Sequence, residues 1–88
     1  MNFTHYNLGQ KSKGEVVEIT LTNAANVRLM NYSNFSNYKN GKKHEYYGGY
    51  ITKSPYKIVI PSLGTWHVTV DVEGLQRSTR SSLNVLSR

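Results

Sequence analysis

The amino-acid sequence predicts an all-β fold, a small antiparallel β-sandwich or open barrel of about seven short strands. The clearest observation is the segment 66–73, in which Trp66 and three valines share one face of a strand while polar residues share the other. Val17, Ile19 and Leu21 alternate with polar residues in the same way. No segment of useful length has the period of an amphipathic helix.

The other strands are predicted from shorter patterns. They are expected at residues 3–8, 26–32, 44–53, 56–60 and 78–86. Pro55 suits the start of the strand at 56–60 because it lacks an N–H group, and Pro61 ends that strand. The last strand is expected to pair in a hairpin with 66–73, and one turn of helix is allowed at 33–38.

Two glycine-containing sites and one tryptophan shape the predicted chain path. Asn40-Gly41 is the strongest turn signal, because both residue types tolerate positive φ. Gly48-Gly49 lies within a predicted strand and indicates a bulge or a close backbone approach. A phosphate-binding loop is disfavoured there, since no helix and no Lys-Ser/Thr pair follows. Trp66 is interpreted as a core anchor, and the alternative is a platform for a ligand.

Length and composition predict a single domain spanning residues 1–88. A domain of this size buries only about 60% of the surface that its unfolded chain exposes, which leaves little room for a large active-site cavity. The absence of cysteine excludes disulfides, a thiolate nucleophile and cysteine zinc sites. With no signal-peptide pattern and no apolar run of ~20 residues, we expect a cytoplasmic protein without a membrane partner.

The charge distribution is uneven. The formal net charge is +6, from eleven Lys or Arg against five acids. In the stretch 28–57 the single acid, Glu45, stands against Arg28, Lys39, Lys42, Lys43, Lys53 and Lys57. Such a surface attracts phosphates, nucleic acid or acidic proteins over about a Debye length. The alternative interpretation is that the charge serves solubility alone.

Aromatic and basic residues interleave between Phe35 and Tyr50. Aromatic faces stack on bases or sugars, and cations attract phosphates. We therefore predict ligand contacts from Arg28, Phe35, Tyr38, Lys42, Lys43, His44, Tyr46, Tyr47 and Lys53. The alternative is that the tyrosines pack half-buried on the sheet with their hydroxyls in water. None of the established nucleic-acid-binding signatures is present.

Catalytic and metal sites are not predicted. His5, His44 and His67 lie on three separate segments without metal-ligand spacing, so no metal is assigned. Asp71 and Glu73 share one face of a strand, but without a recognisable cleft they are interpreted as solvated surface acids. We expect a protein that is not an enzyme, with no catalytic residues and no cofactor.

Five segments carry a family resemblance. They are NVRLM at 26–30, SNF at 33–35, YYGG at 46–49, SP at 54–55 and GTWHVTVD at 64–71. In this order and at these spacings, nearly the whole chain resembles the small bacterial family catalogued as domain of unknown function 1883 (DUF1883). The resemblance implies a compact β-rich domain, found alone or joined to Toll/interleukin-receptor domains. It implies no activity, and it supplies no functional residues to carry over.

Two functional hypotheses follow. The leading one is a binding module that recognises an anionic small molecule or a nucleotide through the segment 35–50. Its rival is a protein-interaction or self-assembly module that works with a signalling or defence partner. In this rival the open sheet edges pair with another protein or with a second copy. Salt separates the two, because phosphate-driven binding weakens steeply as ionic strength rises.

Overall fold

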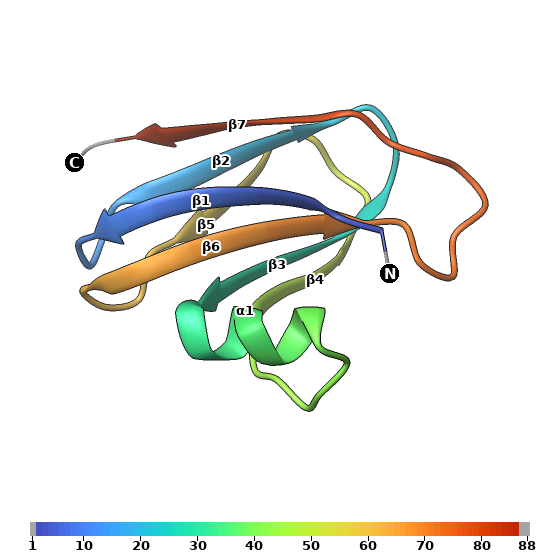
Figure 1. Ribbon diagram of the computed structural model, residues 1–88. Helices are drawn as coiled ribbons and strands as arrows, with labels where there is room; N and C mark the ends of the chain where they lie inside the picture. The colour runs from blue at the N-terminus through green and yellow to red at the C-terminus, as the bar shows by residue number, and fades with distance from the viewer. Residues whose placement is uncertain (1, 87–88) are drawn as a thin grey trace.

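The computed structural model describes residues 2–86, which form seven strands and one helix (Figure 1). In chain order these are β1 (Thr4–Lys11), β2 (Val16–Leu21), β3 (Ala25–Asn31), α1 (Tyr32–Lys39), β4 (Tyr47–Ile51), β5 (Tyr56–Val59), β6 (Gly64–Asp71) and β7 (Ser81–Leu86). Each strand expected from the sequence is therefore present.

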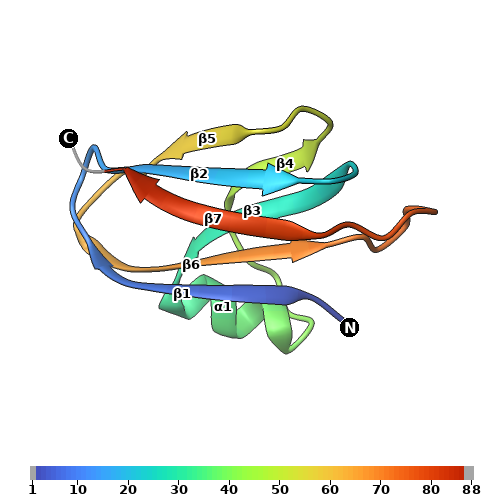
Figure 2. The same ribbon diagram turned by 90° about the horizontal axis from the view of Figure 1, so that it is seen from above.

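The strands form two antiparallel sheets that pack face to face. One sheet has four strands in the order β1-β6-β3-β4, and the other has three in the order β5-β2-β7. Viewed from above, the three-stranded sheet lies over the four-stranded one (Figure 2). The predicted all-β sandwich is confirmed, and the two sheets do not close into a barrel.

The core lies between the two sheets and is built from the inward positions of the alternating patterns. It contains Val17, Ile19, Leu21, Ala25, Val27, Leu29, Ile60, Trp66, Val68 and Val70. Full burial of one large apolar side chain stabilises a fold by about 1.5–3 kcal/mol. Trp66 is confirmed as a core anchor, and its indole N–H is satisfied because Nε1 donates to the carbonyl of Ser62 at 2.9 Å.

The predicted hairpin between the last strand and the segment 66–73 is wrong. β7 pairs with β2 in the three-stranded sheet, with Leu21 opposite Ser81 and Val16 opposite Leu86. Both edges of β6 are already occupied, by β1 on one side and by β3 on the other. After β6, residues 72–80 therefore carry the chain across to the other sheet (Figure 1).

The helix α1 is longer than the single turn allowed by the sequence. Its N-cap is Asn31, whose side chain accepts from the backbone N–H of Asn34 at 3.0 Å. Such a bond satisfies one of the N–H groups that a helix start leaves without a partner. The predicted turn at Asn40-Gly41 is confirmed and ends the helix, with Gly41 at φ +72°.

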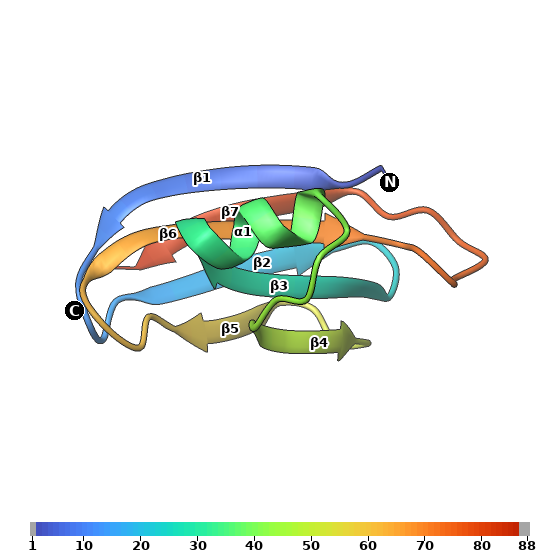
Figure 3. The ribbon, with the colours of Figure 1, turned by 60° about the horizontal axis from the view of Figure 1, so that its bottom comes forward.

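The helix lies across the outer face of the four-stranded sheet (Figure 3). It buries Phe35 and Tyr38 against that face, where they cluster with Met30. The polar side of β6, which the sequence places in solvent, is consequently buried: His67, Thr69 and Asp71 are all covered. The interpretation of Asp71 as a solvated surface acid is therefore wrong.

Candidate functional site

Asp71 is the centre of a buried polar cluster between α1 and the sheet. Its Oδ2 accepts from Arg28 Nη1 and from Tyr38 Oη, each at 2.6 Å. Its Oδ1 accepts from Asn26 Nδ2 at 2.9 Å and from the backbone N–H of Glu73 at 3.1 Å. Four donors from β3, α1 and the chain after β6 therefore converge on one carboxylate.

These donors decide the protonation states in the cluster. Burial alone raises the pKa of Asp71, but the hydrogen bonds from Tyr38, Asn26 and the Glu73 backbone, together with the charge of Arg28, lower it by more. The pKa of Asp71 therefore lies below its ordinary value, and the carboxylate is ionised. Burial, followed by the bond to Asp71, raises the pKa of the Tyr38 hydroxyl, which stays protonated as a donor.

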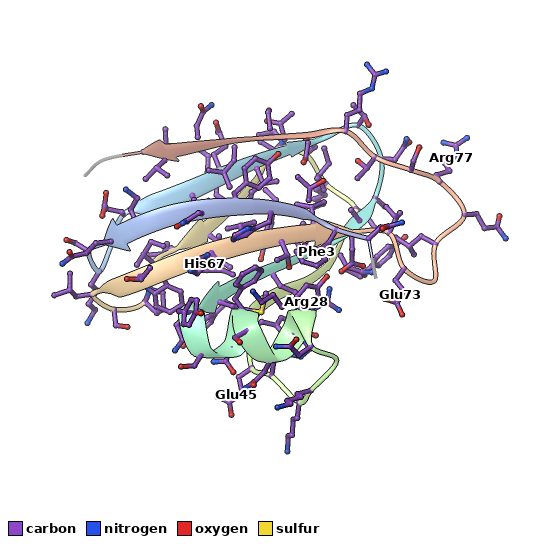
Figure 4. The ribbon with its side chains drawn as sticks, viewed as in Figure 1. Phe3, Arg28, Glu45, His67, Glu73 and Arg77 are labelled. Atoms are coloured by element: carbon purple, nitrogen blue, oxygen red, sulfur yellow. The ribbon has the colours of Figure 1, made fainter. Side chains whose placement is uncertain are left out.

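Arg28 is held between two aromatic rings as well as by Asp71. Its guanidinium carbon lies 5.1 Å from the centre of the Tyr38 ring and 5.0 Å from that of Tyr46. Both distances are within the range of cation–π attraction. In Figure 4 Arg28 lies beside α1, whereas Glu45 lies on the loop that follows the helix, on the side away from the sheet. The charge of Arg28 is thus partly neutralised inside the protein.

Two histidines share a hydrogen bond under the other half of α1. Nε2 of His5 and Nδ1 of His67 lie 2.9 Å apart, so one of the two nitrogens carries the shared proton. Phe35 stacks on both imidazoles, at 4.1 Å from His5 and 4.8 Å from His67. Lys39 Nζ lies over the Phe35 ring at 5.3 Å. A positive charge on His67 would be poorly solvated because this residue is buried, and the charge of Lys39 lowers the pKa of both imidazoles.

We expect the stability of the fold to fall as the pH drops below 6.5, the ordinary histidine pKa. Burial, followed by the charges of His5 and Lys39, lowers the pKa of His67, and burial followed by Lys39 lowers that of His5. The unfolded chain therefore binds more protons below pH 6.5, so the stability is complete above that pH and is lost as the pH falls through the lowered values. Urea unfolding across a pH series measures the effect.

The variant His5→Gln is the companion to this experiment. It removes the more exposed imidazole of the pair and leaves His44, which lies outside the cluster. The acid loss of stability should shrink in this variant, whereas His44→Gln should keep it. Equal pH dependence in both variants would assign the effect to other groups.

An open groove of about 700 Å³ lies where the pairing of β3 with β4 ends. The last pair is Leu29 with Tyr47, and beyond it the two chains separate. The end of β3 and the first turn of α1, the loop before β4, and the loop before β6 contribute the lining, which includes Asn31, Asn34, His44, Glu45, Tyr46, Tyr47, Leu63 and Trp66.

Hydrogen bonds within the protein hold part of this lining in place. Asn34 Oδ1 accepts from the backbone N–H of Glu45 at 2.9 Å, which fastens the loop to the helix. Asn34 Nδ2 donates to Asn31 Oδ1 at 3.1 Å. The Tyr47 ring meets the Trp66 ring edge-on at 6.2 Å. The groove is therefore preformed by α1 and the core rather than by the loop alone.

The structure divides the residues predicted as ligand contacts into three groups. His44, Tyr46 and Tyr47 line the groove. Arg28, Phe35 and Tyr38 belong to the clusters beneath α1. The three lysines lie elsewhere: Lys42 and Lys43 are exposed on the loop before the groove residues, and Lys53 lines a separate small pocket between the turns after β2 and β4.

Several groove residues were not predicted from the sequence. Asn31 and Asn34 carry the signal of a helix N-terminus, an asparagine three residues before another polar residue, which identifies a cap but not a ligand contact. Leu63 belongs to a turn, and Trp66 was interpreted as a core anchor in preference to a ligand platform, so neither was predicted to line the groove. Glu45 was noted as the single acid of a basic stretch and was not among the predicted ligand contacts.

Residues 2–86 were compared with the patterns of a metal cluster and of a membrane-spanning helix. No group of three or more metal-ligating acids or histidines comes together in this part of the chain. His44 does not join His5 and His67 in such a group, and its Nδ1 lies 2.9 Å from the carbonyl oxygen of Lys42. Among the described residues, no helix is long and apolar enough to span a membrane.

Comparison with known proteins gives a family and no functional relative. Neither a curated protein nor a solved structure matches the chain significantly. The model of one protein family matches residues 1–88. Because this match covers the whole chain, the protein belongs to the family described as a domain of unknown function (DUF1883).

Proposed function

We propose that this domain is a non-enzymatic binding module that holds an anionic small molecule with a planar ring, such as a nucleotide, in the groove beside α1. The observation that carries this proposal is the groove itself. Its volume of about 700 Å³ falls within the range of about 300–1,000 Å³ that is usual for small-molecule sites.

The aromatic lining favours a planar ring as the part of the ligand inside the groove. Tyr46 and Tyr47 expose 43% and 53% of their surface, so both rings are accessible to a ligand in the groove. Stacking of a base on one such ring is worth about 1–3 kcal/mol. Both rings are held by the protein, Tyr46 against Arg28 and Tyr47 against Trp66, so little order has to be gained on binding.

The polar lining supplies groups that would read the edge of such a ring. The Asn31 amide nitrogen and the Glu45 carboxylate make no hydrogen bond to any residue from 2 to 86, and both line the groove. An amide donor and a carboxylate acceptor can pair with ring nitrogens, amino groups or sugar hydroxyls. Recognition of this kind separates ligands of similar size.

Charge sets the orientation of the ligand. Glu45 is an acid that lines the groove, and no lysine or arginine does, so a phosphate would be repelled from the interior. Lys42 and Lys43 come just before His44 on the loop and are exposed. The ring therefore enters the groove, and the anionic group stays outside it, near the two lysines.

Titration of the protein with ribonucleoside monophosphates, followed by NMR and calorimetry, tests the proposal. Tyr47→Ala should weaken the best-bound nucleotide about tenfold, because it removes one stacking ring. Tyr50→Ala is the matched control: Tyr50 lies on the same strand and is similarly exposed, but it is outside the groove. The affinity of the Tyr50→Ala variant for the nucleotide should stay within about twofold of the parent value.

The lysines are tested by the double variant Lys42→Gln/Lys43→Gln. It should weaken nucleotide binding and flatten its salt dependence, while binding of the corresponding nucleoside stays the same. If no member of the panel binds at millimolar concentration, or if Tyr50→Ala costs as much as Tyr47→Ala, the groove is not a nucleotide site.

A further inference from the structure

The outer edge of β7 carries none of the features that usually keep a sheet edge from pairing. Exposed edge strands are normally protected by bulges, charges, prolines or short length. β7 pairs with β2 on one side only, and its sequence SSLNVL contains no charge and no proline. No hydrogen bond joins the backbone of β7 to any described residue outside β2.

The three other edges are protected. β1 has a bulge between Asn7 and Gly9 and ends in Lys11. β4 has two successive glycines at positive φ, which make the edge irregular. β5 has only four residues, includes Lys57 and lies between Pro55 and Pro61. β7 therefore differs from every other edge of the sandwich.

The sheet opposite β7 extends one strand further than β7 does. β4 and β5 contact each other on one side of the sandwich, so β1 and β7 lie on the other side. Because four strands face three, β1 projects beyond β7, as the view from above shows (Figure 2). Tyr6 and Leu8 of β1 point into the sandwich but are only partly buried. Tyr6 Oη bonds Ser81 Oγ at 2.7 Å at this boundary.

We infer that an extended peptide segment of a partner protein adds to β7 as a fourth strand, lying over β1. The peptide backbone would take up the free hydrogen-bonding groups of β7, and its inward side chains would cover Tyr6 and Leu8. The two sheets would then have equal strand numbers. This surface lies away from the groove beside α1, so the inference does not depend on the proposed ligand.

A second copy of the chain cannot supply this strand through its own β7. Behind that β7, the β6 and β1 strands of the second copy would occupy the same space as β1 of the first copy, which already projects beyond the edge (Figure 2). Two chains of net charge +6 would also repel each other. A single extended segment avoids both obstacles.

The chemistry of the segment follows from its surroundings. Alternate side chains must be apolar, because one set faces Tyr6 and Leu8 while the other faces solvent. β1 and β7 run in the same direction and contain no acid, with Lys11 at one end and Arg80 at the other (Figure 1). Acidic residues at both ends of the peptide would complement these cations.

The test uses a short peptide in which valine and threonine alternate between acidic ends. Its addition should slow the amide exchange of alternate residues of β7, those whose N–H groups point away from β2, and leave β5, the opposite edge of the same sheet, unchanged. N-methylation of the peptide residues whose N–H groups face β7 should abolish binding. N-methylation of the alternate residues, whose N–H groups point away from β7, should leave binding intact. This readout leaves the protein unaltered.

Two protein variants add a matched comparison. Leu8→Ser should weaken peptide binding about tenfold, since it removes an apolar contact beneath the added strand. Val59→Ser, on the edge strand β5, should have no effect. Protection at β4 or β5, no binding at millimolar peptide, or a peptide-free dimer with protected β7 amides would each overturn the inference.

Discussion

Replacement of Asp71 by asparagine is expected to lower the free energy of unfolding by about 3 kcal/mol, because it removes one partner of a buried ion pair. The Asp71 carboxylate accepts four hydrogen bonds, two of them at 2.6 Å. Asparagine offers one acceptor oxygen and turns its N–H₂ group toward one pair of donors, either Arg28 and Tyr38 or Asn26 and the Glu73 backbone N–H, so two donors lose their acceptor. The expected loss is near the lower end of the range for such pairs because Arg28 keeps 20% of its side-chain surface exposed.

Urea unfolding followed by Trp66 fluorescence measures this loss, and Glu73→Gln is the matched control. Glu73 is an acid two residues further along the chain, but its side chain is exposed. Its replacement removes the same charge and should change the stability by no more than about 0.5 kcal/mol. Similar losses in the two variants would mean that net charge, rather than the buried cluster, is responsible.

The pH dependence gives a second readout of the same variant. The pKa of Asp71 is lowered in the folded protein from its ordinary value of 3.8. The stability that its carboxylate contributes is therefore complete above pH 3.8 and is lost as the pH falls through the lowered value. The difference between the parent and Asp71→Asn should accordingly shrink in acid.

The strands could be predicted from the sequence because a period of two is a local property. The alternation in β2 and β6 needs only one buried face, whichever strand lies beside it. The partner of β7 is not a local property. Adjacent strands usually pair, which favours β6, but both edges of β6 are taken by strands that lie far from it in the sequence. The order of the strands in the sequence does not show that both edges of β6 are already paired.

The helix was underestimated because its composition is polar and its length is short. Its segment YSNFSNYK places only Phe35 and Tyr38 on the buried face, so the periodic signal is two residues. The burial of Asp71 follows from the same helix: β6 alternates as a strand with one wet face would, and only the presence of α1 makes that face interior. A polar strand face that is exposed to solvent and one that is covered by a helix have the same alternating pattern in the sequence.

The candidate site could be predicted only in part for a related reason. The aromatic and basic residues from 35 to 50 are continuous in sequence, but a helix, a loop and a strand separate them in space. Phe35 and Tyr38 face the sheet, while Tyr46 and Tyr47 reach the groove. Arg28 was expected to contact an anionic ligand, but its guanidinium group is paired with Asp71. No spacing in the sequence relates residues 28 and 71.

Replacement of Gly48 by alanine is expected to destabilise the fold by about 3 kcal/mol, through backbone strain and a steric clash. Gly48 has φ +122°, a conformation that alanine rarely adopts. A Cβ atom there would also collide with the carbonyl oxygen of Val27, which belongs to the neighbouring strand β3. The close backbone approach expected at the glycine pair is thus confirmed at Gly48.

Gly49→Ala is the matched control for this variant. Gly49 has a positive φ of +146°, but a Cβ there meets no atom within 4 Å. Gly49→Ala should therefore lower the free energy of unfolding through backbone strain alone, by about 1 kcal/mol. Urea unfolding of the two variants compares the costs, and equal losses would show that the approach to Val27 is not the source of the constraint.

The same pair of variants connects the fold to the groove. Gly48 directly follows Tyr47, whose pairing with Leu29 marks the place where β3 and β4 separate. To relieve the clash with Val27, β4 must move away from β3 and carry Tyr47 away from Trp66. Gly48→Ala should therefore change the Trp66 emission and the NMR signals of the groove residues in the folded state, whereas Gly49→Ala should change them little. Unchanged groove signals in a folded Gly48→Ala variant would mean that the groove is shaped by α1 and its loop, independently of β4.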